Sequence, residues 1–221
     1  MIITFLLEIG FALYVLFRYK LTAVSRLATA VLVGLAIFQL AEFNVCEGAW
    51  GVDSLTWARI GHAVITLLPA LGIHLATKLA GQKQPLLVGA GYVSAAAFAF
   101  IFMFVGHGMT AQECLGNYVI FSIAPQLVIP YTIYYYGWLL IAVAYALWQA
   151  TKQKKKPAKS ALVALAIGYL AFIIPTTAVT IVDPSTLAGI PSIMCGFAVI
   201  LALVLTLKVV PAAHQGEKVR H

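Results

Sequence analysis

Seven long apolar stretches alternate with short polar ones along the chain. They cover residues 2–17, 27–43, 55–77, 86–105, 118–149, 161–182 and 190–210. An α-helix needs about 20 apolar residues to cross the hydrocarbon core of a bilayer, so most of these stretches fit one transmembrane helix each. The first two are short for a span, and the fifth is long. The pattern predicts an all-α integral membrane protein, a bundle of seven transmembrane helices.

The basic residues predict the orientation of this bundle. Thirteen of the 14 Lys and Arg residues lie in four clusters, each behind an odd-numbered apolar stretch, and Arg59 is the exception. The clusters are Arg18, Lys20 and Arg26; Lys78 and Lys83; Lys152, Lys154, Lys155, Lys156 and Lys159; and Lys208, Lys218 and Arg220. Because short cytoplasmic loops carry an excess of Lys and Arg, we expect the N-terminus outside and the C-terminus in the cytoplasm. The first stretch has no basic residues before it and a basic pair behind it, which favours a retained anchor over a signal peptide.

These observations predict one transmembrane domain, residues 1–210, and a short cytoplasmic tail, residues 211–221, in the plasma (inner) membrane. Hydrophobic residues make up 62% of the chain and charged residues 10%, which excludes a soluble domain. The formal net charge of +7 would suggest nucleic acid as the partner of a soluble protein. Here the basic residues flank membrane spans, where they fix topology and contact anionic lipid, so no nucleic-acid partner is expected.

The fifth stretch is longer than one span. Counting back about 20 residues from Lys152 places one group of aromatic residues near each membrane surface. The outer group is Tyr131, Tyr134, Tyr135 and Tyr136, and the inner group is Tyr145 and Trp148. We interpret both as interfacial belts rather than as a ligand cage, because amphipathic rings prefer headgroup depth. Residues 118–128 are then either a tilted helix extension or a segment folded over the outer mouth, with kinks at Pro125 and Pro130.

Two of the three cysteines fall in different external loops. Oxidising surroundings permit a disulfide between Cys46 and Cys114, and the chain-entropy model gives such a bridge about 4 kcal/mol. The alternative is two unpaired loop thiols, and we favour the bridge. Cys195 lies within the seventh stretch and is interpreted as a small packing residue.

Ionisable residues near or inside the spans are the candidates for function, because charge in hydrocarbon needs a partner or a purpose. Glu42 lies at the outer end of the second span, and Arg59 and His62 share one face at the outer end of the third. Together they predict either a polar outer ligand pocket or a structural clasp between Glu42 and Arg59. Glu8 lies about two turns into the first span. It needs a partner or a proton there, unless the first helix enters the membrane so shallowly that Glu8 stays near the interface.

Metal and catalytic chemistry find little support. His62 and His74 are about 18 Å apart along one helix, too far for one ion, and His62 with His107 lacks a surrounding ligand set. The sequence contains no nucleophile elbow, phosphate-binding loop, metalloprotease helix or paired carboxylates within one span. Lys208 lies at a helix end and is unsuited to a retinal Schiff base. We therefore expect no enzyme activity, no metal and no cofactor.

The third stretch with its flanks, LTWARIGHAVITLLPALGIHLATKLAG, resembles a helix of the seven-transmembrane sensory module at the N-terminus of certain bacterial histidine kinases. The matching elements are Trp57, Ala58 and Arg59 at its start, Leu68 and Pro69 in its middle, and the basic exit at Lys78. The final stretch, DPSTLAGIPSIMCGFAVILALVLTLKV, is similar in layout to the end of that module. The resemblance implies a sensory input domain that passes a membrane or extracytoplasmic signal to a cytoplasmic output domain. It adds Trp57 to the pocket candidates as a position of the module.

Only VVPAAHQGEKVRH follows Lys208, too few residues for a kinase or cyclase output domain. We therefore expect a sensor-like module that signals to a separate cytoplasmic protein. Its lipid or partner surface would be Lys152, Lys154, Lys155, Lys156 and Lys159, and the sequence leaves room for a homodimer. A small transporter that uses Glu8 and Glu42 as proton or cation sites is the alternative, and a haem or redox membrane protein is a weaker one.

Overall fold

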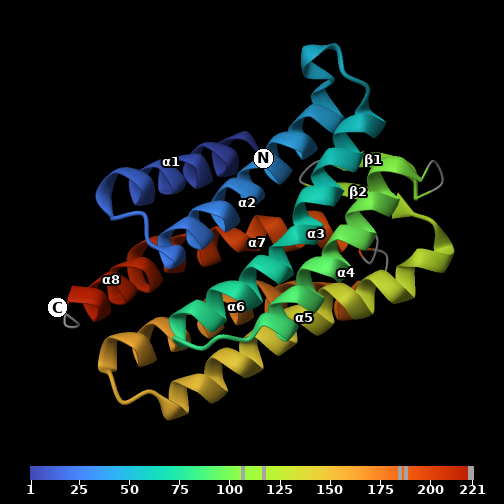
Figure 1. The fold of residues 1–221 in the computed structure, drawn as a ribbon. Coiled ribbons are helices and arrows are strands. Elements are labelled where there is room, and N and C mark those ends of the chain that lie inside the picture. Colours follow the sequence, from blue (N-terminus) through green and yellow to red (C-terminus); the bar gives the residue numbers. More distant parts are fainter. Residues whose placement is uncertain (106–107, 116–117, 184–185, 187–188, 219–221) are drawn as a thin grey trace.

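The computed structural model describes residues 1–105, 108–115, 118–183, 186 and 189–218. Most of it is a bundle of helices that run up and down side by side (Figure 1). The helices are α1 (Ile2–Arg18), α2 (Ala23–Glu47), α3 (Ser54–Leu79), α4 (Pro85–Phe104), α5 (Pro125–Lys152), α6 (Lys156–Val182), α7 (Ile190–Val204) and α8 (Val210–Lys218). A short 3-10 turn, η1 (Ala49–Gly51), follows α2, and a π-helical turn, η3 (Leu205–Val209), joins α7 to α8.

Six helices within the described residues are long and apolar enough to cross a membrane: α2, α3, α4, α5, α6 and the continuous helix that begins with α7. The chain is therefore a multi-pass membrane protein with a predominantly α-helical fold. Helix α1 has 17 residues. At 1.5 Å per residue it is about 26 Å long, slightly shorter than a hydrocarbon core of about 30 Å.

The residues after 210, expected as a tail, continue the last helix as far as Lys218. Helix α8 packs against α6, and the His214 ring lies 5.7 Å from the ring of Tyr19 in the α1–α2 connection. The π-helical turn ends two residues before Pro211, whose ring would clash with the preceding turn of a regular α-helix. The wider turn lets the helix pass the proline without ending.

Helix starts in this chain carry recognisable signals. Four helices have a proline in their first turn, where the missing N–H needs no partner: Pro85, Pro125, Pro157 and Pro191. The predicted kink at Pro125 is therefore wrong, because Pro125 is the first residue of α5. Asp53 caps α3 by accepting a hydrogen bond from the Thr56 N–H at 2.9 Å and one from its hydroxyl, and these bonds lower the pKa of Asp53.

Two paired strands within residues 109–115 and 118–123 form a β-hairpin that the sequence analysis did not predict. Strand β1 (Met109–Leu115) pairs antiparallel with β2 (Tyr118–Ile123), with Cys114 opposite Val119. A tilted helix extension over residues 118–123 is thus wrong, and the segment instead lies across one end of the bundle (Figure 1). Val119 and Phe121, both buried, point inward at alternate positions, as expected for a strand with one covered face.

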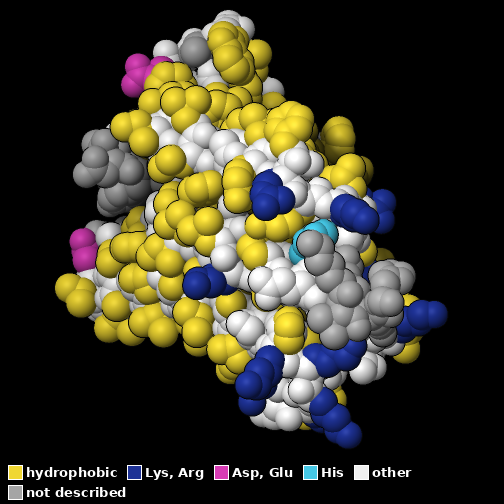
Figure 2. All heavy atoms as spheres, turned by 90° about the vertical axis from the view of Figure 1, so that its left-hand side faces the viewer, with side chains coloured by type: hydrophobic (Ala, Val, Ile, Leu, Met, Phe, Trp, Pro, Cys, Tyr) yellow, Lys and Arg dark blue, Asp and Glu magenta, His cyan; other side chains and the backbone are white. Residues whose placement is uncertain are grey.

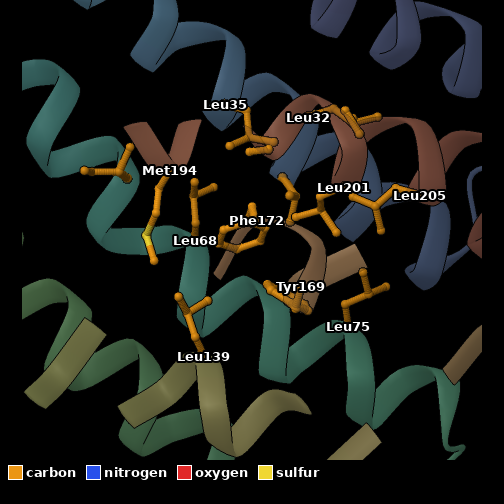
Figure 3. Packing of buried hydrophobic residues seen from close by; sticks show 14 of the residues in the cluster. Leu32, Leu35, Leu68, Leu75, Leu139, Tyr169, Phe172, Met194, Leu201 and Leu205 are labelled. Atoms are coloured by element: carbon orange, nitrogen blue, oxygen red, sulfur yellow. The ribbon is translucent and has the colours of Figure 1, made fainter. Parts of the chain in front are cut away.

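The core runs between α2, α3, α5, α6 and α7, and close helix contacts depend on small residues. Figure 3 labels leucines of α2, α3, α5 and α7 together with Tyr169 and Phe172 of α6, all members of one buried cluster. A Cβ at Gly34 would lie 2.8 Å from a methyl group of Leu68, and one at Gly168 would lie 2.8 Å from a methyl group of Leu201. These glycines let neighbouring backbones approach.

The four basic clusters lie at the end of the bundle opposite the hairpin. Three of them surround the α1–α2, α3–α4 and α5–α6 connections. Of the fourth, Lys208 lies on η3 and Lys218 ends α8, and Arg220 lies outside the described residues. Figure 2 views the molecule from this end, where the Lys and Arg side chains gather. We call it the basic end, and the end that carries the hairpin the hairpin end.

Candidate functional site

A cavity of about 240 Å³ opens at the hairpin end between α3, α5, α7 and β2. It is lined by His62, Ile65, Phe121, Ser122, Ile123, Val128, Tyr131, Thr132, Tyr135, Tyr136, Ile190, Pro191 and Met194. An apolar cavity of about 150 Å³ already holds a benzene molecule, so this one has room for a small ring-containing compound. Its wall is mainly aromatic and aliphatic, with few polar groups.

His62 forms one side of this cavity and is only 1% exposed. Its ring lies 4.7 Å from Phe102, 5.6 Å from Phe121 and 5.4 Å from Tyr131, measured between ring centroids. Its Nδ1 has no hydrogen-bond partner among the described residues. The imidazole therefore brings a polar atom into an otherwise aromatic setting.

Tyrosines of α5 form the facing wall, and hydrogen bonds to α3 hold two of them. The Tyr131 hydroxyl lies 2.9 Å from the Thr66 Oγ1, which itself donates to the His62 carbonyl at 2.7 Å. Tyr134 donates to the Thr66 carbonyl. This network fixes the position of Tyr131 relative to His62.

The interpretation of these tyrosines as an interfacial belt is wrong. Tyr131, Tyr134 and Tyr135 are 7%, 7% and 9% exposed and point into the bundle. A depth count from Lys152 estimates the height of a residue in the membrane, but not the face of the helix on which it lies. The spacing i, i+3, i+4 of these three tyrosines was the available signal, because it places them on one face.

Of the four predicted pocket residues, His62 alone lines the cavity. The half-buried Arg59 has no ion pair, and its buried Nε has no hydrogen-bond partner, within the described part of the chain. The Trp57 ring packs against that of Trp50 at 5.7 Å. Glu42 is also elsewhere, so no Glu42–Arg59 pair forms among the described residues.

The rotation of α2 explains why this pair is absent. A Cβ at Gly61 of α3 would lie 3.0 Å from the Ala41 Cβ and 3.2 Å from the Phe38 ring, so these two residues face α3. Glu42 follows Ala41 by one residue, which turns its side chain about 100° around the helix. It instead makes a hydrogen bond with Ser192 of α7 and interacts electrostatically with Glu8 of α1.

The structure thus brings Glu8 and Glu42 together, although the sequence analysis assigned them to separate sites. Glu8 is 0% and Glu42 1% exposed. Cys195, free and buried, interacts with both carboxyl groups from α7.

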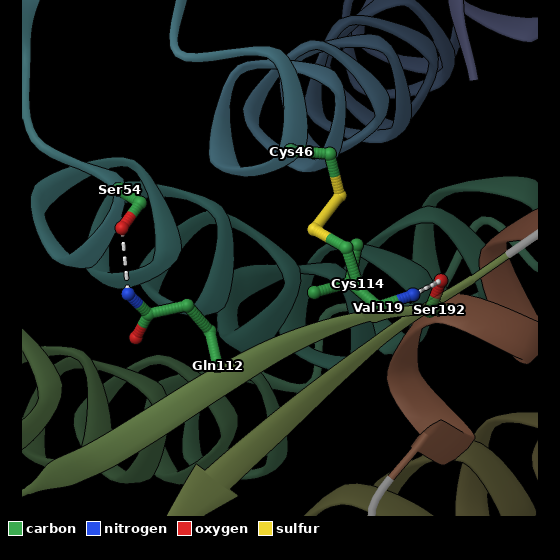
Figure 4. Close-up of a disulfide and its surroundings, with 6 residues drawn as sticks. All are labelled: Cys46, Ser54, Gln112, Cys114, Val119 and Ser192. Atoms are coloured by element: carbon green, nitrogen blue, oxygen red, sulfur yellow. Dashed lines mark hydrogen bonds between the residues drawn. A yellow bond between two sulfur atoms is a disulfide. The ribbon is translucent and has the colours of Figure 1, made fainter. Parts of the chain in front are cut away.

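A disulfide joins Cys46 of α2 to Cys114 of β1, the pairing that the sequence analysis favoured (Figure 4). Two hydrogen bonds also hold the hairpin: Gln112 Nε2 donates to Ser54 Oγ at 2.7 Å, and the Val119 N–H donates to Ser192 Oγ at 3.0 Å. The hairpin, and with it the Phe121 wall of the cavity, is therefore fixed to α2, α3 and α7.

At the basic end, the lysines predicted as a partner or lipid surface are all exposed: Lys152, Lys154, Lys155, Lys156 and Lys159. Gln153 anchors this connection by donating from Nε2 to the Ala80 carbonyl at 3.0 Å. Lys152 also places its ammonium group 3.3 Å from the centre of the Trp148 ring, and Trp148 is 52% exposed. An exposed Trp beside a Lys is typical of the membrane interface.

No group of three or more potential metal ligands occurs in the part of the chain that the structure describes. His107, the second histidine considered together with His62, lies outside the described residues. The protein-family models and the curated proteins compared with this chain give no match.

Proposed function

We propose that this chain is a non-enzymatic, sensor-like module of the plasma membrane that binds a small, largely apolar ring compound at its hairpin end. The observation that carries the proposal is the 240 Å³ cavity, whose walls come from α3, α5, α7 and β2. Ligand pockets are mostly apolar and aromatic with a few polar groups, which fits His62 among the tyrosines. The resemblance of residues 55–81 to a helix of histidine-kinase sensory modules supports the same function.

In this proposal the N-terminus and the hairpin end face outward, and seven helices including α1 cross the membrane. Helices α3 and α5 each reach from the cavity to the basic end. A ligand that alters their packing would therefore change the surface formed by Lys152 to Lys159. A separate cytoplasmic signalling protein would read that change.

Photolabelling tests the ligand pocket. A small phenyldiazirine probe should label Met194, which is 2% exposed and lines the cavity, in a saturable manner that peptide mass spectrometry can follow. Val128→Trp should fill the cavity and abolish this labelling. Ile129→Trp is the matched control, because the adjacent Ile129 is 71% exposed and does not line the cavity. Equal labelling of Met194 in both variants would contradict the proposal.

Lysine replacement tests the partner surface. Changing the five lysines to Gln should reduce co-purification of the cytoplasmic partner, whereas changing them to Arg should not, because Arg preserves the charge that sets topology. If the Gln variant inserts normally and retains both its partner and its signalling output, the surface has no partner role and serves topology and lipid contact.

One observation favours a transporter as the second candidate. Glu8 and Glu42 approach each other inside the bundle, as the proton or cation site of a small transporter requires. Solute uptake into proteoliposomes that disappears in Glu8→Gln or Glu42→Gln would decide for this function over the sensor.

A further inference from the structure

Helix α1 buries one narrow stripe, and a carboxyl group lies in it. The buried residues of α1 are Glu8, Ala12 and Val15, spaced by four and three positions so that they share one face. This face packs against α2, α7 and η3. The chemical state of Glu8 therefore bears directly on how α1 is held in the bundle.

Neither carboxyl group of the Glu8 and Glu42 pair has the partners that a buried charge needs. Both oxygens of Glu8 and the Oε1 of Glu42 are buried without a hydrogen-bond partner among the described residues. An ionised carboxylate in such a place is costly unless a cation or several donors compensate it. A neutral, protonated carboxyl group costs far less.

The surroundings offer little positive charge. Glu8 interacts electrostatically with Glu42 of α2 and with the amino group of Met1. Glu42 interacts with the same amino group and makes its hydrogen bond with Ser192. The Cys195 thiol of α7 interacts electrostatically with both carboxyl groups. No Lys, Arg or His is among the groups found to act on either carboxyl within the described residues. Two carboxylates thus share a site with less positive charge than ionisation of both requires.

We propose that Glu8 and Glu42 form a proton-binding site that controls the docking of α1 on α2 and α7. When the site is occupied, a carboxyl O–H keeps the buried face of α1 neutral and the helix docked. On release, the O–H bond breaks, its electrons stay on the carboxylate, and the proton passes to water as hydronium. Glu8 and Glu42 are then both negatively charged, and this second buried charge weakens the contact of α1 with α2 and α7.

This site is distinct from the ligand cavity, so the inference goes beyond the proposed function. Pro191 and Met194 of α7 line the cavity, whereas Ser192 makes its hydrogen bond with Glu42. Cys195 does not line the cavity, and it acts electrostatically both on the two carboxyl groups and on the cavity residues Tyr131 and Tyr135. Ser192 also accepts the hydrogen bond of the β2 Val119 N–H, which links the proton site to the hairpin.

Dicyclohexylcarbodiimide provides the test, since this apolar reagent modifies protonated carboxyl groups in apolar surroundings. In the full chain in nanodiscs, mass spectrometry should find modification of Glu8 or Glu42 near neutral pH, falling about tenfold per pH unit above the midpoint of the site. Exposed Glu47 serves as the internal control and should remain unmodified. Amide hydrogen exchange of α1, corrected for the intrinsic effect of pH, should rise over the same range in the wild type and stay flat in Glu8→Gln.

Glu47→Gln, on the same helix as Glu42, is the matched control and should keep the wild-type pH dependence. Modification of Glu47 alone, or exchange of α1 that does not change with pH in the wild type, would overturn the proposal. Suppression of the modification by sodium chloride but not by choline chloride would assign the site to a metal cation and would also overturn it. The wild-type measurements decide these points even if Glu8→Gln fails to fold.

Discussion

Gly72 lets α3 and α6 approach closely at a point where the Tyr169 hydroxyl fills the space that a side chain would need. Tyr169 is 3% exposed and packs against Phe172, so it has little room to move. We predict that Gly72→Ala destabilises the protein by about 1–2 kcal/mol, because overpacking outweighs the better helix propensity of Ala. Thermal melts in detergent would measure the loss. Gly137→Ala is the control, since nothing lies within 4 Å of its Cβ, and equal melting shifts in the two variants would refute the packing argument.

Arg59 and Glu42 illustrate how far single residues could be predicted. The sequence identified His62 as a pocket residue and Glu8 and Glu42 as groups that need partners. It could not identify the partners, because the rotation of each helix depends on packing such as the contact of Gly61 with Ala41. The tyrosines of α5 were missed for the same reason.

The absence of a contact between Arg59 and Glu42 gives a quantitative prediction. Arg59→Ala and Glu42→Gln should change the free energy of unfolding additively, within about 0.5 kcal/mol, because the two side chains share no contact among the described residues. Glu8→Gln and Glu42→Gln should instead be clearly non-additive, since each removes one member of an interacting pair. A double-mutant cycle measured by chemical unfolding in detergent compares the two cases. Strong energetic coupling between Arg59 and Glu42 would instead support the structural clasp between these two residues.

Among the elements, the helices were predicted well and the hairpin was not. Apolar stretches of about 20 residues have few alternatives to a transmembrane helix, so α3, α4 and α6 agree closely with them. Residues 118–123 are equally apolar and continue into α5 without a polar break, so hydropathy alone merged the two. Their β-branched and aromatic residues favour a strand, and the following Pro125 favours a new helix start. Only the pairing with β1 determines that this segment is a strand.

The disulfide is the main covalent constraint on the hairpin. It closes a loop between residues 68 positions apart. Replacing Cys46 and Cys114 together by Ser should lower the free energy of unfolding by about 4 kcal/mol in the chain-entropy model. It should also weaken photolabelling of Met194, because Phe121 of the hairpin walls the cavity. Unfolding curves with and without reductant would measure the first effect. A double Ser variant as stable as the wild type under non-reducing conditions would show that the hydrogen bonds of Gln112 and Val119 hold the hairpin alone.

At the scale of the whole molecule, the two ends differ in chemistry. The hairpin end carries the cavity and the disulfide, and the opposite end carries the basic clusters (Figures 1 and 2). Disulfides form on the oxidising side of a membrane and basic loops remain on the cytoplasmic side, so two independent rules predict the same orientation. The proton site lies between α1, α2 and α7, close to the residues of α7 that line the cavity.

Orientation can be tested with single cysteines in a Cys195→Ala background. Val52→Cys, in the turn before α3, should react with a membrane-impermeant maleimide in intact cells, because this residue is 38% exposed at the hairpin end. Gln82→Cys, exposed in the α3–α4 connection, should react only after permeabilisation. A tag placed before Met1 should be accessible from outside if α1 crosses the bilayer, and from inside if this 17-residue helix does not. Reaction of Gln82→Cys in intact cells would invert the orientation, and the basic clusters would then need an explanation other than topology.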